Sequence, residues 1–317
     1  MHKKFRMLAA TMTALAGLAT SVYAADAKTI GVSIPAADHG WTSGVVYHAQ
    51  RVADLLMKEH EGLKVIVKTS PDPASQANAV QDLETQGIDA LVILPTDPDP
   101  LVNAIKEVKG KGTFVSIVDR APSVNDNSVR DLYVAGNNPA LGEVAGNYIK
   151  ETSPEAKVVV IRGLPIPIDQ QRQDGFDKAI AGSKVQVLDR QFGNWNRDDA
   201  FRVMQDFLTK YPAIDVVWCQ DDDMAVGVLQ AIEQAKRTDI KYVVGGAGSK
   251  DMIKKVMDGD KMIPVDVLYP PSMVGTAMEL TAAALYDQIP AHGTYTLDAT
   301  LVTKDNAKNY YFPDSPF

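Results

Sequence analysis

The 317 residues include a single cysteine, Cys219. One cysteine excludes an intrachain disulfide and any zinc site built on several thiolates. Basic residues are also in the minority, because 32 lysines and arginines stand against 40 aspartates and glutamates, for a formal net charge of −8. Nucleic-acid binding depends on basic side chains that neutralise phosphates, so this balance argues against a nucleic-acid partner.

Long apolar stretches are missing as well, apart from one near the start. Charge is absent from residues 7–22, which follow Lys3, Lys4 and Arg6 and lead to a small-residue pattern ending at Ala24. This order is typical of a secretory signal peptide, with cleavage predicted after Ala24. A membrane anchor is the alternative, but the run is shorter than the ~20 apolar residues that a spanning helix needs. The sequence therefore predicts an exported, periplasmic protein.

The overall composition is that of an ordinary folded protein, with 45% hydrophobic and 23% charged residues. These values exclude a collagen, a disordered chain and a coiled coil. A chain of this length is expected to form about two domains.

Short β-branched runs alternate with longer amphipathic runs along the chain. This order is typical of βαβ units around a parallel sheet, and the apolar runs suit sheets that helices cover on both faces. The segment 121–130 interrupts the alternation and indicates a boundary between two α/β lobes. The predicted strands are 29–34, 63–68, 90–94, 113–118, 132–135, 158–161, 185–188, 216–218, 242–244 and 262–268. The predicted helices span 41–58, 74–86 and 100–109, or begin near Pro139, Gln170, Arg197, Met224 and Lys250.

Aromatic and charged side chains follow the predicted strands. In open parallel sheets, ligands bind just outside the carboxyl ends of the strands. An indole face packs on the apolar face of a sugar ring, while carboxylates and guanidiniums bind its hydroxyls. The candidate binding residues at these positions are Asp38, His39, Trp41, Asp119, Arg120, Arg172, Trp195, Asp221 and Tyr269.

Six motifs occur in a fixed order behind the predicted signal peptide. They are Ile30-Gly31-Val32-Ser33 leading to Trp41, Pro95-Thr96-Asp97, Asp119-Arg120, Arg172-Gln173-Asp174-Gly175-Phe176, Trp195-Asn196-Arg197 and Gln220-Asp221-Asp222-Asp223-Met224-Ala225. In this order they resemble the motifs of bacterial periplasmic sugar-binding proteins of ABC transporters, of the ribose-binding type. The resemblance covers nearly the whole of the predicted mature chain.

The resemblance implies a type I periplasmic binding fold, in which three crossing segments join two doubly wound parallel-sheet lobes. A monosaccharide or sugar alcohol would be buried between the lobes and delivered to an ABC permease in the membrane by a monomer without a cofactor. Whether a chemoreceptor is a further partner stays open. Matched onto this chain, the first lobe spans 28–136 plus 270–298, and the second spans 137–269 plus 299–317.

The resemblance also assigns roles to individual residues. Trp41 and Trp195 match aromatic residues that stack on opposite faces of the sugar ring. Asp119 and Arg120 match a pair that grips sugar hydroxyls, and Arg172 matches an arginine from the second lobe.

Other positions depart from the ribose-binding pattern. Asp221 stands where the ribose binder has an asparagine, and Tyr269 stands where it has a glutamine on a crossing strand. These departures predict that ribose is not the ligand, and they leave a polyol, a different monosaccharide or an amino sugar open. The amino sugar is considered because Asp38, Asp119 and Asp221 outnumber Arg120 and Arg172. The remaining departures are Thr42, Leu94, Gly246 and Ala247.

Two other classes of function compete with a binding protein. A secreted sugar-acting enzyme would need a carboxylate pair as acid and base, and none stands out. A sugar-responsive repressor shares the fold but needs an N-terminal helix-turn-helix, where this chain has a predicted signal peptide. A metal is not expected either, since His39 has no His or Cys partner at metal spacing and Asp222 and Asp223 are predicted to cap a helix. The sequence therefore predicts a binding protein and not an enzyme.

Overall fold

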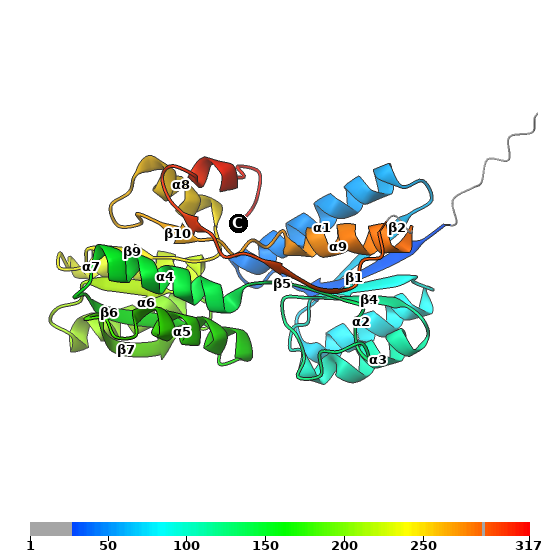
Figure 1. Cartoon of the computed structure of the whole chain (residues 1–317), viewed down its shortest axis with the longest axis horizontal. Coiled ribbons are helices and arrows are strands. Elements are labelled where there is room, and N and C mark those ends of the chain that lie inside the picture. The colour runs from blue at the N-terminus through cyan, green and yellow to red at the C-terminus, as the bar shows by residue number, and fades with distance from the viewer. Residues whose placement is uncertain (1–26, 287–288) are drawn as a thin grey trace, which may run out of the picture.

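The computed structural model describes residues 27–286 and 289–317, so the predicted signal peptide and its cleavage site lie outside the described residues. Two sheets, each with helices on both faces, lie next to each other along the long axis of the molecule (Figure 1). The strand pairs within these two sheets are parallel. The predicted α/β class with parallel sheets is therefore confirmed.

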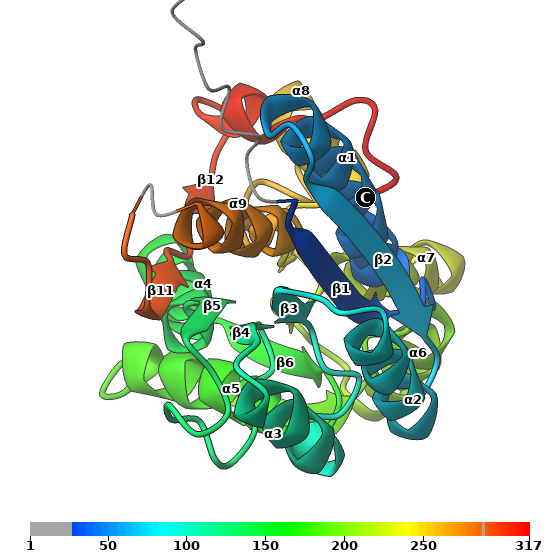
Figure 2. The ribbon, with the colours of Figure 1, turned by 90° about the vertical axis from the view of Figure 1, so that its right-hand side faces the viewer.

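The first sheet has six strands in the order β11-β5-β4-β3-β1-β2. Its central strands are apolar because helices α1 and α9 cover one face and helices α2 and α3 cover the other (Figure 2). We call this sheet with its helices the first lobe. Its strands are β1 (Thr29–Pro35), β2 (Lys64–Ser70), β3 (Ala90–Ile93), β4 (Phe114–Val118), β5 (Leu132–Gly136) and β11 (Gly293–Leu297). Its helices are α1 (Gly40–Glu59), α2 (Pro73–Thr85), the 3₁₀ turn η1 (Asp99–Leu101), α3 (Val102–Gly110) and α9 (Met273–Leu285).

The second sheet has four strands in the order β7-β6-β8-β9, and with its helices it forms the second lobe. Alternate residues of β6 pack in two different hydrophobic cores, one on each face of the sheet. Val158 and Val160 pack with α4, whereas Val159 and Ile161 pack with α6 and α7. Its strands are β6 (Lys157–Arg162), β7 (Gln186–Phe192), β8 (Val216–Cys219) and β9 (Tyr242–Val244). Its helices are α4 (Asn138–Thr152), α5 (Pro167–Ile180), α6 (Arg197–Lys210), α7 (Asp222–Ala235), α8 (Lys250–Asp258) and η2 (Ala307–Tyr310).

Helices α4 and α5 approach closely, and this contact positions one of the predicted site residues. A Cβ at Gly142 of α4 would lie 1.8 Å from the backbone oxygen of Arg172 on α5. A Cβ at Gly175 of α5 would lie 2.0 Å from the backbone oxygen of Pro139. Because both positions lack a side chain, the two helix backbones pack against each other and Arg172 is held at the edge that faces the first lobe.

The chain passes between the lobes after β5, after β10 and after β11 (Figure 1). Backbone hydrogen bonds join these segments, because Asn137 N–H donates to Leu297 O and Leu268 N–H donates to Thr300 O, each at 2.9 Å. Two short strands form an antiparallel pair beside the crossings, β10 (Asp266–Val267) and β12 (Leu301–Val302).

Two predictions about the chain path were wrong. The predicted strand 262–268 is reduced to β10, because only Asp266 and Val267 face a partner strand. The segment 121–130 is not a boundary between lobes, since β4 and β5 on either side of it are neighbours in the same sheet. Strand β11 was missed because it lies at the sheet edge, where its exposed residues show no apolar run.

Within residues 27–286 and 289–317, no helix combines the length and the apolar character that crossing a membrane requires.

Candidate functional site

A small cavity lies between the lobes at the carboxyl ends of their strands. Every predicted site residue except Asp38 lines the cavity. The lining residues are His39, Trp41, Asp119, Arg120, Ile168, Arg172, Trp195, Asp221, Ala247 and Tyr269.

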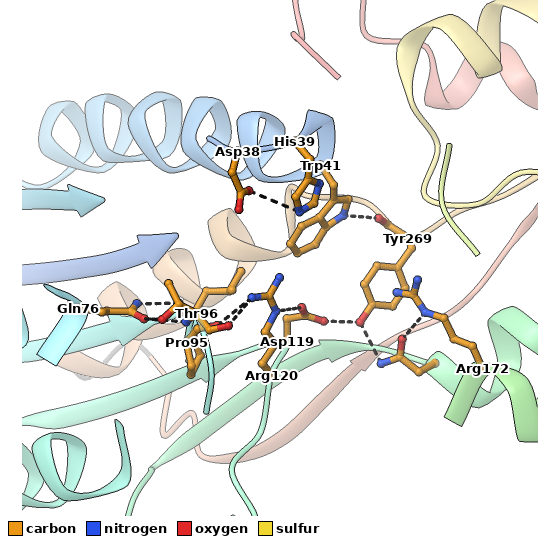
Figure 3. Close-up of polar contacts among 12 residues, drawn as sticks. Asp38, His39, Trp41, Gln76, Pro95, Thr96, Asp119, Arg120, Arg172 and Tyr269 are labelled. Carbon is orange, nitrogen blue, oxygen red and sulfur yellow. Dashed lines mark hydrogen bonds and ion pairs between the residues drawn. The ribbon is translucent and has the colours of Figure 1, made fainter. Parts of the chain in front are cut away.

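Asp119 and Arg120 come directly after β4. Asp119 has a φ of 60°, a left-handed conformation that is uncommon for a residue with a side chain, and Tyr133 Oη donates to its backbone oxygen at 2.7 Å. Arg120 Nη1 donates to the backbone oxygens of Thr96 at 2.8 Å and Pro95 at 3.3 Å (Figure 3). Arg120 Nε lies 3.7 Å from Asp119 Oδ2 and, among the described residues, has no hydrogen-bond partner. A donor is therefore left for a ligand in the cavity.

The carbonyls that hold Arg120 are themselves positioned by Gln76, which the sequence analysis did not single out. Gln76 Oε1 accepts from Thr96 N at 2.7 Å and from Thr96 Oγ1 at 2.9 Å, while Gln76 Nε2 donates to Leu94 O at 2.9 Å (Figure 3). Gln76 is fully buried on α2 and has no contact with the cavity. A buried amide between apolar helix positions was the only sequence signal for this supporting role.

The two tryptophans are each 5% exposed and come from opposite lobes. Trp41 Nε1 donates to Tyr269 O at 2.9 Å, which fixes this indole against a crossing segment. Trp195 has a φ of 53°, and its Nε1 is buried without a partner in the described residues. The guanidinium carbons of Arg120 and Arg172 both lie 5.9 Å from the centre of the Trp195 ring. The Trp195 ring therefore faces charge from both lobes.

Tyr269 lines the cavity, and its hydroxyl joins residues of the two lobes. Its hydroxyl donates to a carboxylate oxygen of Asp119 and accepts from Asn138 Nδ2 at 3.0 Å (Figure 3). Arg172 Nε donates to Asn138 Oδ1 and Arg172 Nη1 donates to Gln220 O, both at 2.8 Å. Burial, followed by the nearby Asp119 charge, raises the pKa of Tyr269 far above its usual range, so the phenol stays a hydrogen-bond donor. The sequence analysis missed Asn138, which follows β5 at a crossing.

Asp38 does not line the cavity. Its side chain is 70% exposed, and its carboxylate accepts from Thr42 Oγ1 at 2.8 Å in the turn before α1. Thr42 Oγ1 also accepts from the backbone N–H of His39 at 3.1 Å, so this hydroxyl closes the turn. His39 does line the cavity, and burial lowers its pKa despite the nearby Asp38 charge. Asp38 Oδ1 lies 3.7 Å from His39 Nε2 (Figure 3), so Asp38 contacts a lining residue from the solvent side.

The roles predicted for the three consecutive aspartates were partly wrong. Asp221 is the N-cap of α7, because its Oδ1 accepts from Asp223 N at 2.8 Å and from Met224 N at 3.4 Å. Asp222 and Asp223 are not the cap, since the helix begins at Asp222. Asp221 also lines the cavity, and burial together with its two acidic neighbours raises its pKa well above the usual range.

Asp223 connects the lobes at the rim of the cavity. Its Oδ2 accepts from the backbone N–H of Gly40 at 2.6 Å, and its Oδ1 accepts from Arg197 Nη2 at 2.9 Å. The first turn of α1 has no acidic residue, so Asp223 brings the negative charge that a helix N-terminus favours from the other lobe. A Cβ at Gly40 would lie 2.5 Å from Asp223 Oδ2 and 2.8 Å from Phe317 Cδ2. We call Gly40, Asp223, Arg197 and Phe317 the seam.

A second buried acidic pair lies beside the crossing strand β10. Asp222 Oδ1 accepts from Gly246 N at 2.9 Å, and Asp222 Oδ2 accepts from Ser249 N at 2.6 Å. Both Asp222 and Asp266 face the space beside Gly245, and Asp266 Oδ2 is buried with no partner in the described residues. Burial raises the pKa of Asp266 to about 7, and burial with the Asp266 charge raises the pKa of Asp222. A proton on the pair removes the repulsion between two buried carboxylates.

This pair predicts that stability falls as the pH rises from about 4 to about 7. In that window the folded protein keeps a proton that an unfolded carboxyl with a pKa of about 4 has released. The free energy of unfolding should fall by up to about 1.4 kcal/mol per pH unit for each retained proton and then level off. Asp266→Asn should flatten the profile and be more stable than wild type at pH 8. Urea denaturation at pH 5 and pH 8 measures both.

The matched control is Asp54→Asn, which changes an exposed carboxyl on α1. The free energy of unfolding of this variant should change with pH as that of wild type does. If the free energy of unfolding of Asp266→Asn also changed with pH as in wild type, the pair would not hold a proton in the folded state.

Two features bear on catalysis and metal binding in the part of the chain that the structure describes. No group of three or more His, Cys, Asp or Glu side chains is placed to hold a metal ion there. Cys219 is buried, and burial raises the pKa of its thiol, which keeps it from acting as a thiolate nucleophile.

A family model described as a periplasmic binding protein domain matches residues 30–288, most of the chain. The chain belongs to the periplasmic binding proteins. The ribose import binding protein RbsB of Escherichia coli is 31% identical over 300 residues, which cover 93% of each chain. The galactofuranose-binding protein YtfQ of Escherichia coli is 27% identical, over 97% of this chain and 96% of that one.

Solved structures agree with this family membership. A solute-binding protein of an ABC transporter from Mycobacterium smegmatis, solved with bound glycerol, superposes with a TM-score of 0.79. It is 27% identical, and the match covers 91% of this periplasmic binding protein and 98% of that chain. The proteins to which the chain is similar are binding proteins and not enzymes. The cavity between the lobes is therefore considered as a ligand-binding site.

Proposed function

We propose that this periplasmic binding protein captures a monosaccharide or sugar alcohol between its lobes and delivers it to an ABC permease as a monomer. The observation that carries the proposal is the cavity in which two indoles and several charged groups converge from both lobes. Indoles suit the apolar faces of a carbohydrate, and carboxylates and guanidiniums suit its hydroxyls. The names of the ribose and galactofuranose relatives support a carbohydrate ligand.

The proposed role of each side chain follows from the atoms and ring faces that it can still offer to a ligand. Trp41 and Trp195 supply apolar and indole N–H contacts from opposite lobes. Arg120 offers an unpaired Nε, and Asp119 offers the carboxylate oxygen that Tyr269 does not use. The other proposed ligand contacts are His39, Arg172, Asp221 and Tyr269.

Capture requires that the lobes separate and close. The proposed lobes are 28–136 plus 270–298 and 137–269 plus 299–317, with the crossings as hinges. Because groups from both lobes are needed, only the closed state completes the site, and ligand shifts the population toward closure.

We also propose that the protein acts in the periplasm after cleavage of the signal peptide. The uncharged run and the pattern ending at Ala24 support cleavage at this position. The expected mature N-terminus is Ala25, which mass spectrometry of protein from the periplasmic fraction reads directly. Recovery of Met1 in that fraction would contradict the cleavage site.

The binding function is tested by a thermal-shift screen of pentoses, hexoses, polyols and amino sugars, followed by calorimetry of each hit. Ligand at a thousand times its dissociation constant should stabilise the folded state by about 4 kcal/mol. Ribose is expected to bind poorly, because Ala247, which lines the cavity, offers no side-chain hydrogen bond where the ribose-binding pattern has a polar residue. No response to any compound, or conversion of a compound to product, would contradict the proposal.

A further inference from the structure

Tyr269 forms part of the cavity wall, and its ring is closely packed. It is 2% exposed, and a Cβ at Gly136 would lie 2.2 Å from Tyr269 Cε2, so the phenol ring lies directly on the backbone at the end of β5. The guanidinium carbon of Arg172 lies 4.4 Å from the ring centre on Tyr269. Together with the hydrogen bonds to Asp119 and Asn138, these contacts hold the ring on all sides (Figure 3).

The ring therefore lies between Asp119 and Arg172, which would otherwise bind a ligand from opposite lobes. One carboxylate oxygen of Asp119 accepts from the Tyr269 hydroxyl. Arg172 Nε donates to Asn138 Oδ1, and Arg172 Nη1 donates to Gln220 O. A six-membered sugar ring bridging Asp119 and Arg172 would have to occupy the position of the phenol. The space that remains lies toward Arg120 and the two indoles.

The indoles do not form an open slot for a sugar ring. Both guanidiniums, of Arg120 and Arg172, lie over the Trp195 ring. The Trp41 ring is 6.1 Å from the Tyr269 ring and tilted by 39°. A flexible chain of hydroxyl-bearing carbons fits between such groups more easily than a rigid ring that needs a free aromatic face.

The cavity holds buried polar atoms that no described residue satisfies. Arg120 lies beside Asp119, with Nε 3.7 Å from Oδ2, and this Nε still has no hydrogen-bond partner among the described residues. The buried polar atoms left without a partner in the described part of the cavity are Arg120 Nε, Trp195 Nε1 and His39 Nδ1. Hydroxyl oxygens satisfy such groups without adding charge.

We propose that Tyr269 limits the ligand to a short acyclic polyol and excludes hexopyranoses. This inference rests on the proposed carbohydrate-binding function and names the ligand class of the same site. The phenol ring acts by volume, since it takes the place that a pyranose ring would need. The hydroxyl holds the ring in that place.

The test is calorimetric titration of the full mature chain with erythritol, xylitol, ribitol, ribose, glucose and galactose. Wild type should bind at least one of the three polyols tenfold or more tightly than either hexose. Tyr269→Gln removes the ring and keeps a polar side chain, so the preference for polyols over hexoses should shrink at least tenfold. Tyr269→Phe keeps the ring and should keep the size limit while affinity falls.

The outcomes separate this inference from the function on which it rests. Wild type that binds glucose or galactose as tightly as the best polyol would refute the size limit and leave sugar binding intact. Relaxed selection in Tyr269→Phe as well as Tyr269→Gln would show that volume is not the cause. If Tyr269→Gln does not fold, the wild-type and Tyr269→Phe titrations decide. Wild type that binds none of the compounds would contradict both the proposed function and this inference.

Discussion

Replacing Arg120 with alanine is expected to weaken ligand binding by about 2–5 kcal/mol, which corresponds to about a 30- to 5,000-fold rise in Kd. Arg120 Nε is a buried donor with no partner in the described residues, and a ligand hydroxyl would satisfy it. The substitution also leaves the buried Asp119 carboxylate without the Arg120 guanidinium beside it. Calorimetry with the best compound from the screen measures the change.

The matched control is Arg130→Ala in the same lobe. Arg130 is 9% exposed, as Arg120 is, and its guanidinium donates to Asn125 and to Gly293 O, away from the cavity. This variant should lose stability and keep its affinity. Near wild-type affinity in Arg120→Ala would show that Arg120 supports the loop and not the ligand.

Gly40→Ala is expected to weaken ligand binding indirectly, because it destabilises the closed state of the two lobes. The new Cβ would lie 2.5 Å from Asp223 Oδ2 and 2.8 Å from Phe317, so the seam would have to shift. Overpacking of this kind costs about 1–3 kcal/mol. A cost confined to the closed state raises the observed Kd about 5- to 150-fold, since ligand binds only the closed fraction. Small-angle scattering should show a larger radius of gyration than wild type at equal ligand concentration.

Two further variants test this explanation. Gly110→Ala also adds one methyl group to a helical glycine, but its Cβ would meet nothing within 4 Å, so affinity should not change. Asp223→Asn keeps the size of the side chain and removes the charge at the N-terminus of α1, so it should weaken binding less than Gly40→Ala. Unchanged affinity in both Gly40→Ala and Asp223→Asn would show that the seam does not contribute to closure.

The alternation of strands and helices was predictable because it depends on local pattern. Apolar runs such as β3 and β8 are buried on both faces, and this leaves a periodicity that the sequence shows directly. Residues just after parallel strands gather at one edge of the sheet, so position together with the family resemblance predicted Asp119, Arg120 and Trp195, which line the cavity. Strand β11 lacked this signal because it lies at an edge.

Two features could not be predicted from local pattern: where each side chain lies, and which residues far apart in the chain are in contact. Asp38 and His39 are neighbours in the chain and lie in contact, yet Asp38 is mostly exposed while His39 lines the cavity. The contact between Gly40 and Asp223 spans 183 positions, and no local pattern of either residue indicates it. Which aspartate of three caps α7 depended on where the helix begins, and helix boundaries vary by a residue or two in any pattern.

The sequence by itself determined that the chain is a parallel α/β protein with polar and aromatic side chains at its strand ends, because these properties follow from composition and periodicity. Only the tertiary structure decided how those side chains share hydrogen bonds. Tyr269 joins Asp119 of the first lobe to Asn138 beside Arg172 of the second, and this arrangement sets how much of the cavity is left for a ligand. Its physical basis is the packing of two lobes whose facing residues are far apart in the chain.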